Sequence, residues 1–197
     1  MYENIHISEP KWKSWIIQTT TPLFTPEQCR EIIASGRAQK PQTAQVGMNK
    51  PGGGTDTKKR ITTIGWIPFK EMGHMYHDLY KFIVKANENH FGFGDIRITE
   101  QAQFTEYPEG GFYDWHMDCD VNMSHEPPVR KISMTLLLND PSEFEGGQLE
   151  LMAPGKFADL KQGHAICFAS FLNHRVSKVT RGMRQSLVVW FGGKPFR

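Results

Sequence analysis

Two histidines and one aspartate in the second half of the sequence have the types and spacing of a metal site. His116 and Asp118 lie two residues apart in the stretch FYDWHMD, and His174 follows in NHRV. In an extended strand, residues two apart point to the same face, so this imidazole and this carboxylate could reach one ion. Two histidines and a carboxylate on one face of an octahedron suit non-haem Fe(II) and leave the opposite face open. We therefore expect His116, Asp118 and His174 to be the metal ligands.

An arginine near the distal histidine suggests what else this site binds. Arg184 lies ten residues beyond His174, at the start of an apolar run, SLVVW. A guanidinium can hold a carboxylate through two parallel hydrogen bonds, which fix its orientation. A metal triad with a buried arginine fits a dicarboxylate, one end of which chelates the metal while the other end is clamped. We expect Arg184 to be this clamp.

The stretch from about residue 104 to residue 193 resembles the 2-oxoglutarate and Fe(II)-dependent oxygenases, and among them the prolyl 4-hydroxylase-like branch. The order HxD, H and R, with roughly 55–60 residues between the aspartate and the distal histidine, is the signature of that superfamily. The resemblance implies a double-stranded β-helix, or jelly roll. It also implies Fe(II), 2-oxoglutarate as cosubstrate and dioxygen, with ascorbate as a candidate reductant.

Shorter matches assign further residues by resemblance. Tyr107, in a Tyr-Pro pair before the HxD motif, resembles the tyrosine that hydrogen-bonds the distal carboxylate of the cosubstrate. Tyr113 and Trp190 match aromatic residues that flank the substrate side of the pocket. Ser133 belongs to an RxxSxxxxLN pattern that begins at Arg130, and it is expected to be a cosubstrate contact.

The match to this branch is incomplete in three places. Gln148 stands where the FxGGEL turn has glutamate, and Leu137 stands where hypoxia-sensing prolyl hydroxylases have a second tyrosine. The clamp is Arg184, whereas collagen-type enzymes use lysine. These departures leave the superfamily resemblance in place and leave the substrate open.

Other candidate residues have ordinary explanations. His74 and His77 lie three apart on a predicted helix without a third ligand nearby, and they are interpreted as a solvated pair. His125 is expected to be a surface residue and His164 a structural one. Cys119 is expected to be a small packed residue, and Asp120 is an alternative carboxylate to Asp118. Five basic residues are expected to be solvated: Lys58, Lys59, Arg60, Arg175 and Arg181. They would favour an acidic or phosphorylated substrate only if they converged at the pocket.

Helices are expected in the first half of the chain. Thr25 and Gln28 resemble a capping box, and the helix that they begin should end near Gly36. Apolar residues recur at helical spacing over residues 69–89, which predicts a second helix. Residues 40–60 contain three consecutive glycines and no periodic apolar face. This segment is either a plain connector or a lid over the active site.

Short apolar runs separated by turn-rich breaks follow from residue 96 onward, and they predict a β-sandwich or barrel. The expected fold is mainly β, a jelly-roll core with N-terminal helices packed on one sheet. We expect one domain over residues 1–197, with a helical support over 1–95 and a catalytic core over 96–197.

Composition limits the class of protein. A net charge of +2 gives no reason to expect nucleic acid, and no run approaches the roughly 18 apolar residues of a membrane span. The N-terminus lacks the plan of a signal peptide. The three cysteines are widely spaced and form no CxxC pair, which favours free thiols and a cytoplasmic protein.

The expected function is hydroxylation of a C–H bond, with release of succinate and carbon dioxide and with a peptidyl proline as the leading substrate. Two alternatives remain. The same core could hydroxylate a free amino acid, a nucleobase or a small metabolite. A metal-binding jelly roll without catalysis is the other, and it would have no use for Arg184 and Tyr107.

Overall fold

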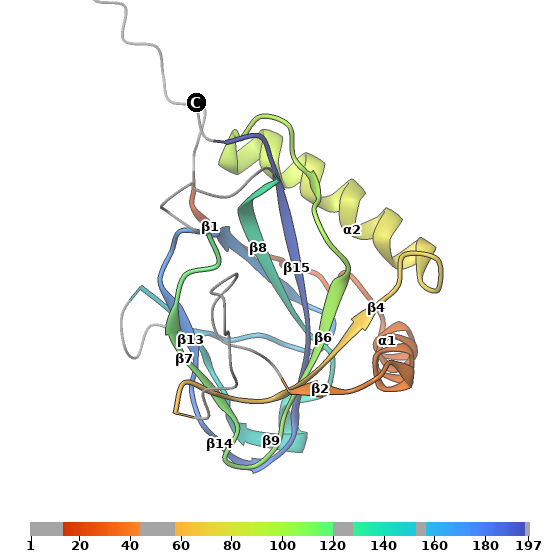
Figure 1. Ribbon diagram of the computed structural model, residues 1–197, viewed down its shortest axis with the longest axis vertical. Coiled ribbons are helices and arrows are strands. Elements are labelled where there is room, and N and C mark those ends of the chain that lie inside the picture. Colours follow the sequence, from red (N-terminus) through yellow and green to blue (C-terminus); the bar gives the residue numbers. More distant parts are fainter. Residues whose placement is uncertain (1–13, 44–57, 120–127, 153–156, 196–197) are drawn as a thin grey trace, which may run out of the picture.

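The computed structural model describes residues 14–43, 58–119, 128–152 and 157–195 (Figure 1). Most of the glycine-rich segment 40–60 lies outside the described residues, as do Asp120 and His125. The interpretation of residues 40–60 as a connector or a lid therefore stays a prediction from the sequence. In the described part of the chain, neither α-helix has the length and apolar character to cross a bilayer.

Two α-helices and fifteen strands make up the described chain. The helical segments are α1 (Pro26–Ala38), α2 (Gly73–Ala86), the π-helical turn η1 (Asn87–Phe91) and the 3₁₀ turn η2 (Pro141–Glu143). The first eight strands are β1 (Ile16–Gln18), β2 (Gln42–Thr43), β3 (Arg60–Ile61), β4 (Thr63–Ile67), β5 (Arg97–Ile98), β6 (Ala102–Tyr107), β7 (Phe112–His116) and β8 (Val129–Leu137). The others are β9 (Phe144–Gly146), β10 (Leu149–Leu151), β11 (Phe157–Ala158), β12 (Ala165–Ala169), β13 (His174–Val176), β14 (Val179–Gly182) and β15 (Arg184–Gly193).

Helix α1 begins as its sequence predicts. The Thr25 hydroxyl accepts from the Gln28 backbone N–H, and the Gln28 side chain accepts from the Thr25 N–H, which completes the capping box. The helix runs two residues past Gly36. That glycine lies against Phe104 of β6, where a Cβ atom would be only 2.2 Å from the ring. Gly36 therefore serves close packing of the helix on the sheet more than it serves as a stop signal.

Helix α2 is shorter at its start than the predicted 69–89 helix. Pro68 accepts a backbone hydrogen bond from Glu71 in a turn, and the helix begins only at Gly73. Its buried face carries the expected apolar residues at helical spacing: Met75, Tyr76, Leu79 and Ile83. At its C-terminal end it continues into the π-helical turn η1, which closes at Gly92 with a left-handed φ of 70°.

The strands form two main sheets. The larger has the order β1-β12-β8-β15-β6-β4-β2, with β5 also paired to β15, and the smaller has the order β11-β10-β13-β7-β3. Strands β14 and β9 make a separate two-stranded ribbon. Both α-helices lie on the same side of the larger sheet, and β7 and β13 lie away from them (Figure 1).

Strict alternation gives the larger sheet two different faces. Ile132, Met134 and Leu136 of β8 join the core cluster that the helices cover, together with Leu187 and Val189 of β15. Their neighbours in sequence point to the other side, toward the smaller sheet. That inner face is partly apolar and partly polar, and its buried polar residues are Gln103, Thr105, Ser133, Thr135, Arg184 and Ser186. The space between the sheets is thus prepared for polar chemistry.

The first half of the chain contributes more than helices. Strands β1, β2, β3 and β4 all precede residue 96, so the sheets do not begin at the boundary expected from the sequence. These strands are two to five residues long, too short for periodicity to reveal. Two of them matter for the site, because β3 pairs with β7 and β4 pairs with β6.

Candidate metal centre

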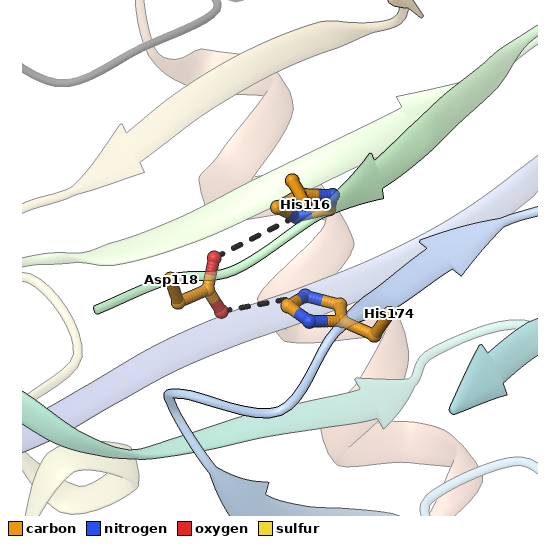
Figure 2. A group of neighbouring side chains, drawn as sticks. All are labelled: His116, Asp118 and His174. Carbon is orange, nitrogen blue, oxygen red and sulfur yellow. Dashed lines mark ion pairs between the residues drawn. The ribbon is translucent and has the colours of Figure 1, made fainter. Parts of the chain in front are cut away.

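The structure brings His116, Asp118 and His174 together between the two sheets. One ligand atom from each lies within 4.8 Å of the others (Figure 2). His116 Nε2 is 3.6 Å from Asp118 Oδ1, and His174 Nε2 is 3.5 Å from Asp118 Oδ2. Within the described residues, this is the only such group of three histidine, cysteine or carboxylate side chains.

The strand pairing explains how residues far apart in sequence meet. His116 at the end of β7 is the direct partner of His174 at the start of β13 in the antiparallel ladder. Asp118 lies beyond the end of β7, so the strand periodicity used on the sequence does not itself place it. Its backbone N–H instead donates to the Ser170 carbonyl at 2.9 Å, which turns the chain back over the two histidines.

Both imidazoles are oriented through their other nitrogen. His116 Nδ1 lies 2.7 Å from the Asp114 carbonyl oxygen, and His174 Nδ1 lies 3.0 Å from the Leu172 carbonyl oxygen. Because a carbonyl oxygen only accepts, each Nδ1 carries the proton and each Nε2 presents its lone pair toward Asp118. Hydrogen-bonded Nδ1 with free Nε2 is how metal-binding histidines are held in proteins.

Burial and mutual contact set the ionisation of the site. Burial, followed by the proximity of His174, lowers the pKa of His116 to about 3, so this imidazole is neutral near pH 7. Burial alone would raise the pKa of Asp118, but His174 and His116 outweigh it and lower that pKa to about 2. A neutral imidazole and an anionic carboxylate are the forms that bind a metal without first losing a proton.

Ser133, which the resemblance predicts to be a cosubstrate contact, lies against the candidate metal ligand Asp118, and its contact with the cosubstrate stays a prediction. Its hydroxyl donates to Asp118 Oδ2 at 2.7 Å and lies 2.9 Å from the Ser170 hydroxyl. Ser133 is only 1% exposed, because its β8 position faces inward under Asp118. We therefore interpret Ser133 as a positioning residue for the carboxylate.

Ser133→Ala is expected to weaken Fe(II) binding by roughly 10- to 100-fold, the usual cost of losing a group that orients a metal ligand. Anaerobic metal titration measures this affinity. Ser35→Ala is the matched control, since the Ser35 hydroxyl is buried in α1 and has no hydrogen-bond partner among the described residues. Equal metal affinity in Ser133→Ala and the wild type would show that the Ser133 hydroxyl does not orient Asp118.

A cavity of about 660 Å³ opens beside the triad. Tyr113 and Trp190, both expected on the substrate side, line it. The Tyr113 ring stacks on the His116 imidazole at 3.5 Å between centroids. Trp190 lies under the Arg130 guanidinium at 3.7 Å, and Arg130 in turn forms a two-pronged ion pair with Glu100. The wall around the candidate metal position is therefore aromatic and rigidly braced.

Arg184 lines a second cavity of about 430 Å³. Leu149 lines both cavities. Tyr107 of the first cavity contacts Arg184, with the Arg184 guanidinium 5.5 Å from the centre of the Tyr107 ring. The two residues are direct partners on β6 and β15. The structure thus brings the expected clamp and the expected tyrosine together.

The charge of Arg184 has no counter-charge in the described chain. The residue is 2% exposed, and its hydrogen bond runs from Nη1 to the Ser186 hydroxyl at 2.9 Å. No ion pair joins it to a carboxylate among the described residues, and burial lowers its pKa. The Tyr107 hydroxyl likewise makes no hydrogen bond within those residues. Buried charges in proteins are normally paired, so this pocket is suited to an incoming carboxylate.

The alternative candidates lie elsewhere. His74 and His77 are exposed on α2, and His164 Nδ1 lies 3.0 Å from the Thr19 carbonyl oxygen. Most of the basic group does not converge on the pocket, because Arg175 pairs with Glu150 and Arg181 pairs with Glu145. Arg60 is the exception and lines the cavity. The sequence identified Arg60 only as one of several basic residues, since nothing near it predicted the strand β3.

Residues 102–192 match the model of the 2OG-Fe(II) oxygenase superfamily. Two curated relatives are PKHD-type hydroxylases. One, from Acidovorax ebreus, is 34% identical over 99 residues, and one from Xylella fastidiosa strain M12 is 37% identical over 101 residues. The alignments cover 48% and 47% of this chain and 44% of each relative, so the chain matches less than half of their length.

Two solved structures resemble almost the whole chain. A viral collagen prolyl hydroxylase from Paramecium bursaria Chlorella virus-1 has a TM-score of 0.70 at 16% identity, over 92% of this chain and 97% of that one. A Pseudomonas putida prolyl-4-hydroxylase has a TM-score of 0.68 at 22% identity, over 92% and 94%. These matches confirm the expected jelly-roll fold, and the family match confirms the resemblance stated from the sequence.

Proposed function

We propose that this chain, whose residues 102–192 carry the core of the 2OG-Fe(II) oxygenase superfamily, is a 2-oxoglutarate- and Fe(II)-dependent dioxygenase that hydroxylates a C–H bond of its substrate. Succinate and carbon dioxide are the other products. The observation that carries the proposal is a His-Asp-His group in one cavity together with a buried arginine, without a counter-charge among the described residues, in a second cavity that shares Leu149 with the first.

The residues present fit both groups that this reaction needs. His116, Asp118 and His174 offer two neutral nitrogens and one carboxylate, the donor set that suits Fe(II) with open positions. Arg184, with Tyr107 beside it, would hold the distal carboxylate of 2-oxoglutarate. When bound, the iron and 2-oxoglutarate supply the oxidising chemistry, and the protein supplies orientation and exclusion of side reactions.

Each part of the wall then has a separate task. The Asp114 and Leu172 carbonyls hold the imidazoles in one tautomer, and Ser133 holds the carboxylate. The stacked Tyr113 ring and the braced Trp190 ring confine the substrate on the open side of the metal position. Fixed orientation of this kind favours reaction at one C–H bond over another.

A prolyl residue in a peptide or protein is the substrate we propose. Several structures with this fold are named as prolyl hydroxylases, and one of them, from Trichoplax adhaerens, is in complex with a hypoxia-inducible-factor peptide. The cavity of about 660 Å³ has room for a peptide residue between its aromatic walls. Hydroxylation of a free amino acid, a nucleobase or a small metabolite is the second candidate. A non-catalytic metal-binding module is disfavoured by the unpaired charge of Arg184.

The surroundings of the reaction are also part of the proposal. We place it in the cytoplasm, where thiols stay reduced, because Cys29, Cys119 and Cys167 are free and buried. Ascorbate is the reductant that we propose for keeping the iron in its ferrous state. We also propose that residues 1–197 act as one domain, since strands from both halves of the chain share each main sheet.

Adding Fe(II) and 2-oxoglutarate together without oxygen tests this function directly. We expect a weak visible absorption band that neither component gives alone, because it arises when 2-oxoglutarate chelates the bound iron. Admission of air should then release succinate, and a substrate peptide should increase the rate. A protein that binds Fe(II) but shows neither the band nor succinate is a metal-binding module.

A further inference from the structure

A second buried arginine, Arg60 of β3, lies at the candidate metal pocket. It is 8% exposed and lines the cavity of about 660 Å³ beside the triad, whereas Arg184 lines the second cavity. Its guanidinium lies over the Tyr113 ring at 4.3 Å, and that ring stacks on His116 at 3.5 Å. Arg60 is therefore one ring away from a candidate iron ligand, in the part of the pocket open to substrate.

Both sheets fix the position of this guanidinium. Tyr113 of the smaller sheet supports its face, and Nη2 donates to Gln103 Oε1 of the larger sheet at 3.0 Å. The Thr105 hydroxyl lies 3.4 Å from the same Gln103 oxygen. A guanidinium held on a ring face and at one nitrogen is pre-organised, so little rotational freedom is lost when its other N–H groups bind a ligand.

The positive charge of Arg60 is not compensated within the described chain. Among the described residues its buried Nε has no hydrogen-bond partner, and its hydrogen bond goes to a neutral amide. Asp118, the carboxylate in the same cavity, lies against the two candidate histidine ligands, and two other carboxylates are engaged elsewhere. Glu106 pairs with Arg37 and accepts from Gln185, while Glu100 pairs with Arg130. A buried cation of this kind is expected to meet an anion.

We propose that Arg60 binds a carboxylate of the substrate, so that the pocket selects substrates with an acidic group close to the hydroxylated carbon. This inference rests on the proposed oxygenase function and names its substrate class. In the proposed function the cosubstrate has its own clamp, Arg184 of the second cavity with Tyr107 beside it. The carboxylate at Arg60 thus belongs to the other reactant.

The stacking distances limit where this carboxylate can be. Arg60, Tyr113 and His116 follow one another at 4.3 and 3.5 Å, whereas one residue of extended chain spans about 3.3–3.6 Å. The acidic group is therefore within about two or three residues of the carbon that is oxidised. An α-carboxylate on the hydroxylated amino acid and an acidic side chain beside it in a peptide both meet this condition.

Two matched probe pairs test the proposal and separate these sources. One pair is N-acetyl-Ala-Pro-Asp-amide and its Asn analogue, and the other is N-acetyl-proline and its amide. Their affinities are measured with the full chain loaded with Fe(II) and 2-oxoglutarate without oxygen. In at least one pair, the acid should bind roughly 10- to 100-fold tighter than the amide, as expected for charge-assisted hydrogen bonds. The pair that shows this preference identifies the source.

The same measurements on variants assign the preference to Arg60. Arg60→Met should bring the acid-to-amide ratio close to one, and Arg60→Lys, which keeps the charge but loses the fork, should give an intermediate ratio. Arg181→Gln is the control, because Arg181 is exposed and ion-paired to Glu145. Far-UV circular dichroism checks the fold, and if Arg60→Met does not fold, the wild-type and Arg60→Lys ratios decide.

Three results overturn the proposal. The first is equal or undetectable binding of acid and amide by the wild type. The second is an acid preference that survives in Arg60→Met or is undiminished in Arg60→Lys, and the third is a raised 2-oxoglutarate requirement as the only effect of these variants. The underlying function fails separately. A wild type that prefers acids but forms no succinate in air contradicts the oxygenase and leaves the role of Arg60 intact. A wild type that forms succinate but does not prefer acids supports the oxygenase and contradicts the role of Arg60.

Discussion

Replacing His174 with alanine is expected to abolish Fe(II)-dependent succinate formation. The substitution removes one of three ligands and leaves Asp118 without the imidazole that most strongly lowers its pKa. Loss of a group that merely orients a ligand weakens metal binding by about 10- to 100-fold, so loss of the ligand itself should cost at least roughly 100-fold. Anaerobic Fe(II) titration and succinate release in air measure the two effects.

His77→Ala is the matched control for this variant. His77 is exposed on α2, and its loss should change neither metal affinity nor succinate release. Thermal unfolding of both variants without metal separates a lost ligand from a lost fold. Undiminished turnover in a folded His174→Ala protein would mean that the metal binds elsewhere.

Replacing Arg184 with alanine should raise the 2-oxoglutarate concentration needed for half-maximal succinate formation by roughly 100-fold. Truncating one partner of a buried charge pair usually costs about 2–5 kcal/mol, because the other charge is left unpaired. Fe(II) affinity should remain, since Arg184 lines the second cavity and is not part of the triad. The two effects can be measured on one preparation, by metal titration and by varying 2-oxoglutarate.

Arg181→Ala is the control for this second variant. Arg181 lies three residues earlier and is half exposed, and its ion pair with Glu145 at 2.9 Å is at the surface, where such pairs contribute little. Its 2-oxoglutarate requirement should match that of the wild type. An Arg184→Ala protein with an unchanged requirement would place the cosubstrate carboxylate somewhere else.

Much of the fold could be predicted from local patterns. The capping box at Thr25, the helical spacing in α2 and the apolar runs that became β8, β12 and β15 are all visible in the sequence. Strands of two to five residues, such as β3 and β4, have too few positions to show alternation. They form because neighbouring strands offer hydrogen bonds, and that information lies elsewhere in the chain.

The candidate site shows the same limit more sharply. Residue types and order were enough to select His116, Asp118, His174 and Arg184, and the structure brings the first three together. The hydrogen bond from Ser133 to Asp118 could not be predicted, because it depends on where the chain turns after β7. Arg60 was visible only as one of several basic residues, since its burial depends on the pairing of β3 with β7.

The direct pairing of His116 with His174 links metal affinity to local strand order. β13 has only three residues, and its first residue is a candidate ligand. Fraying of that strand end would separate the two imidazoles long before the helices or the larger sheet unfolded. Iron affinity would therefore fall with temperature or denaturant ahead of global unfolding. Bound iron would in turn stabilise the pairing of β7 with β13 in the smaller sheet.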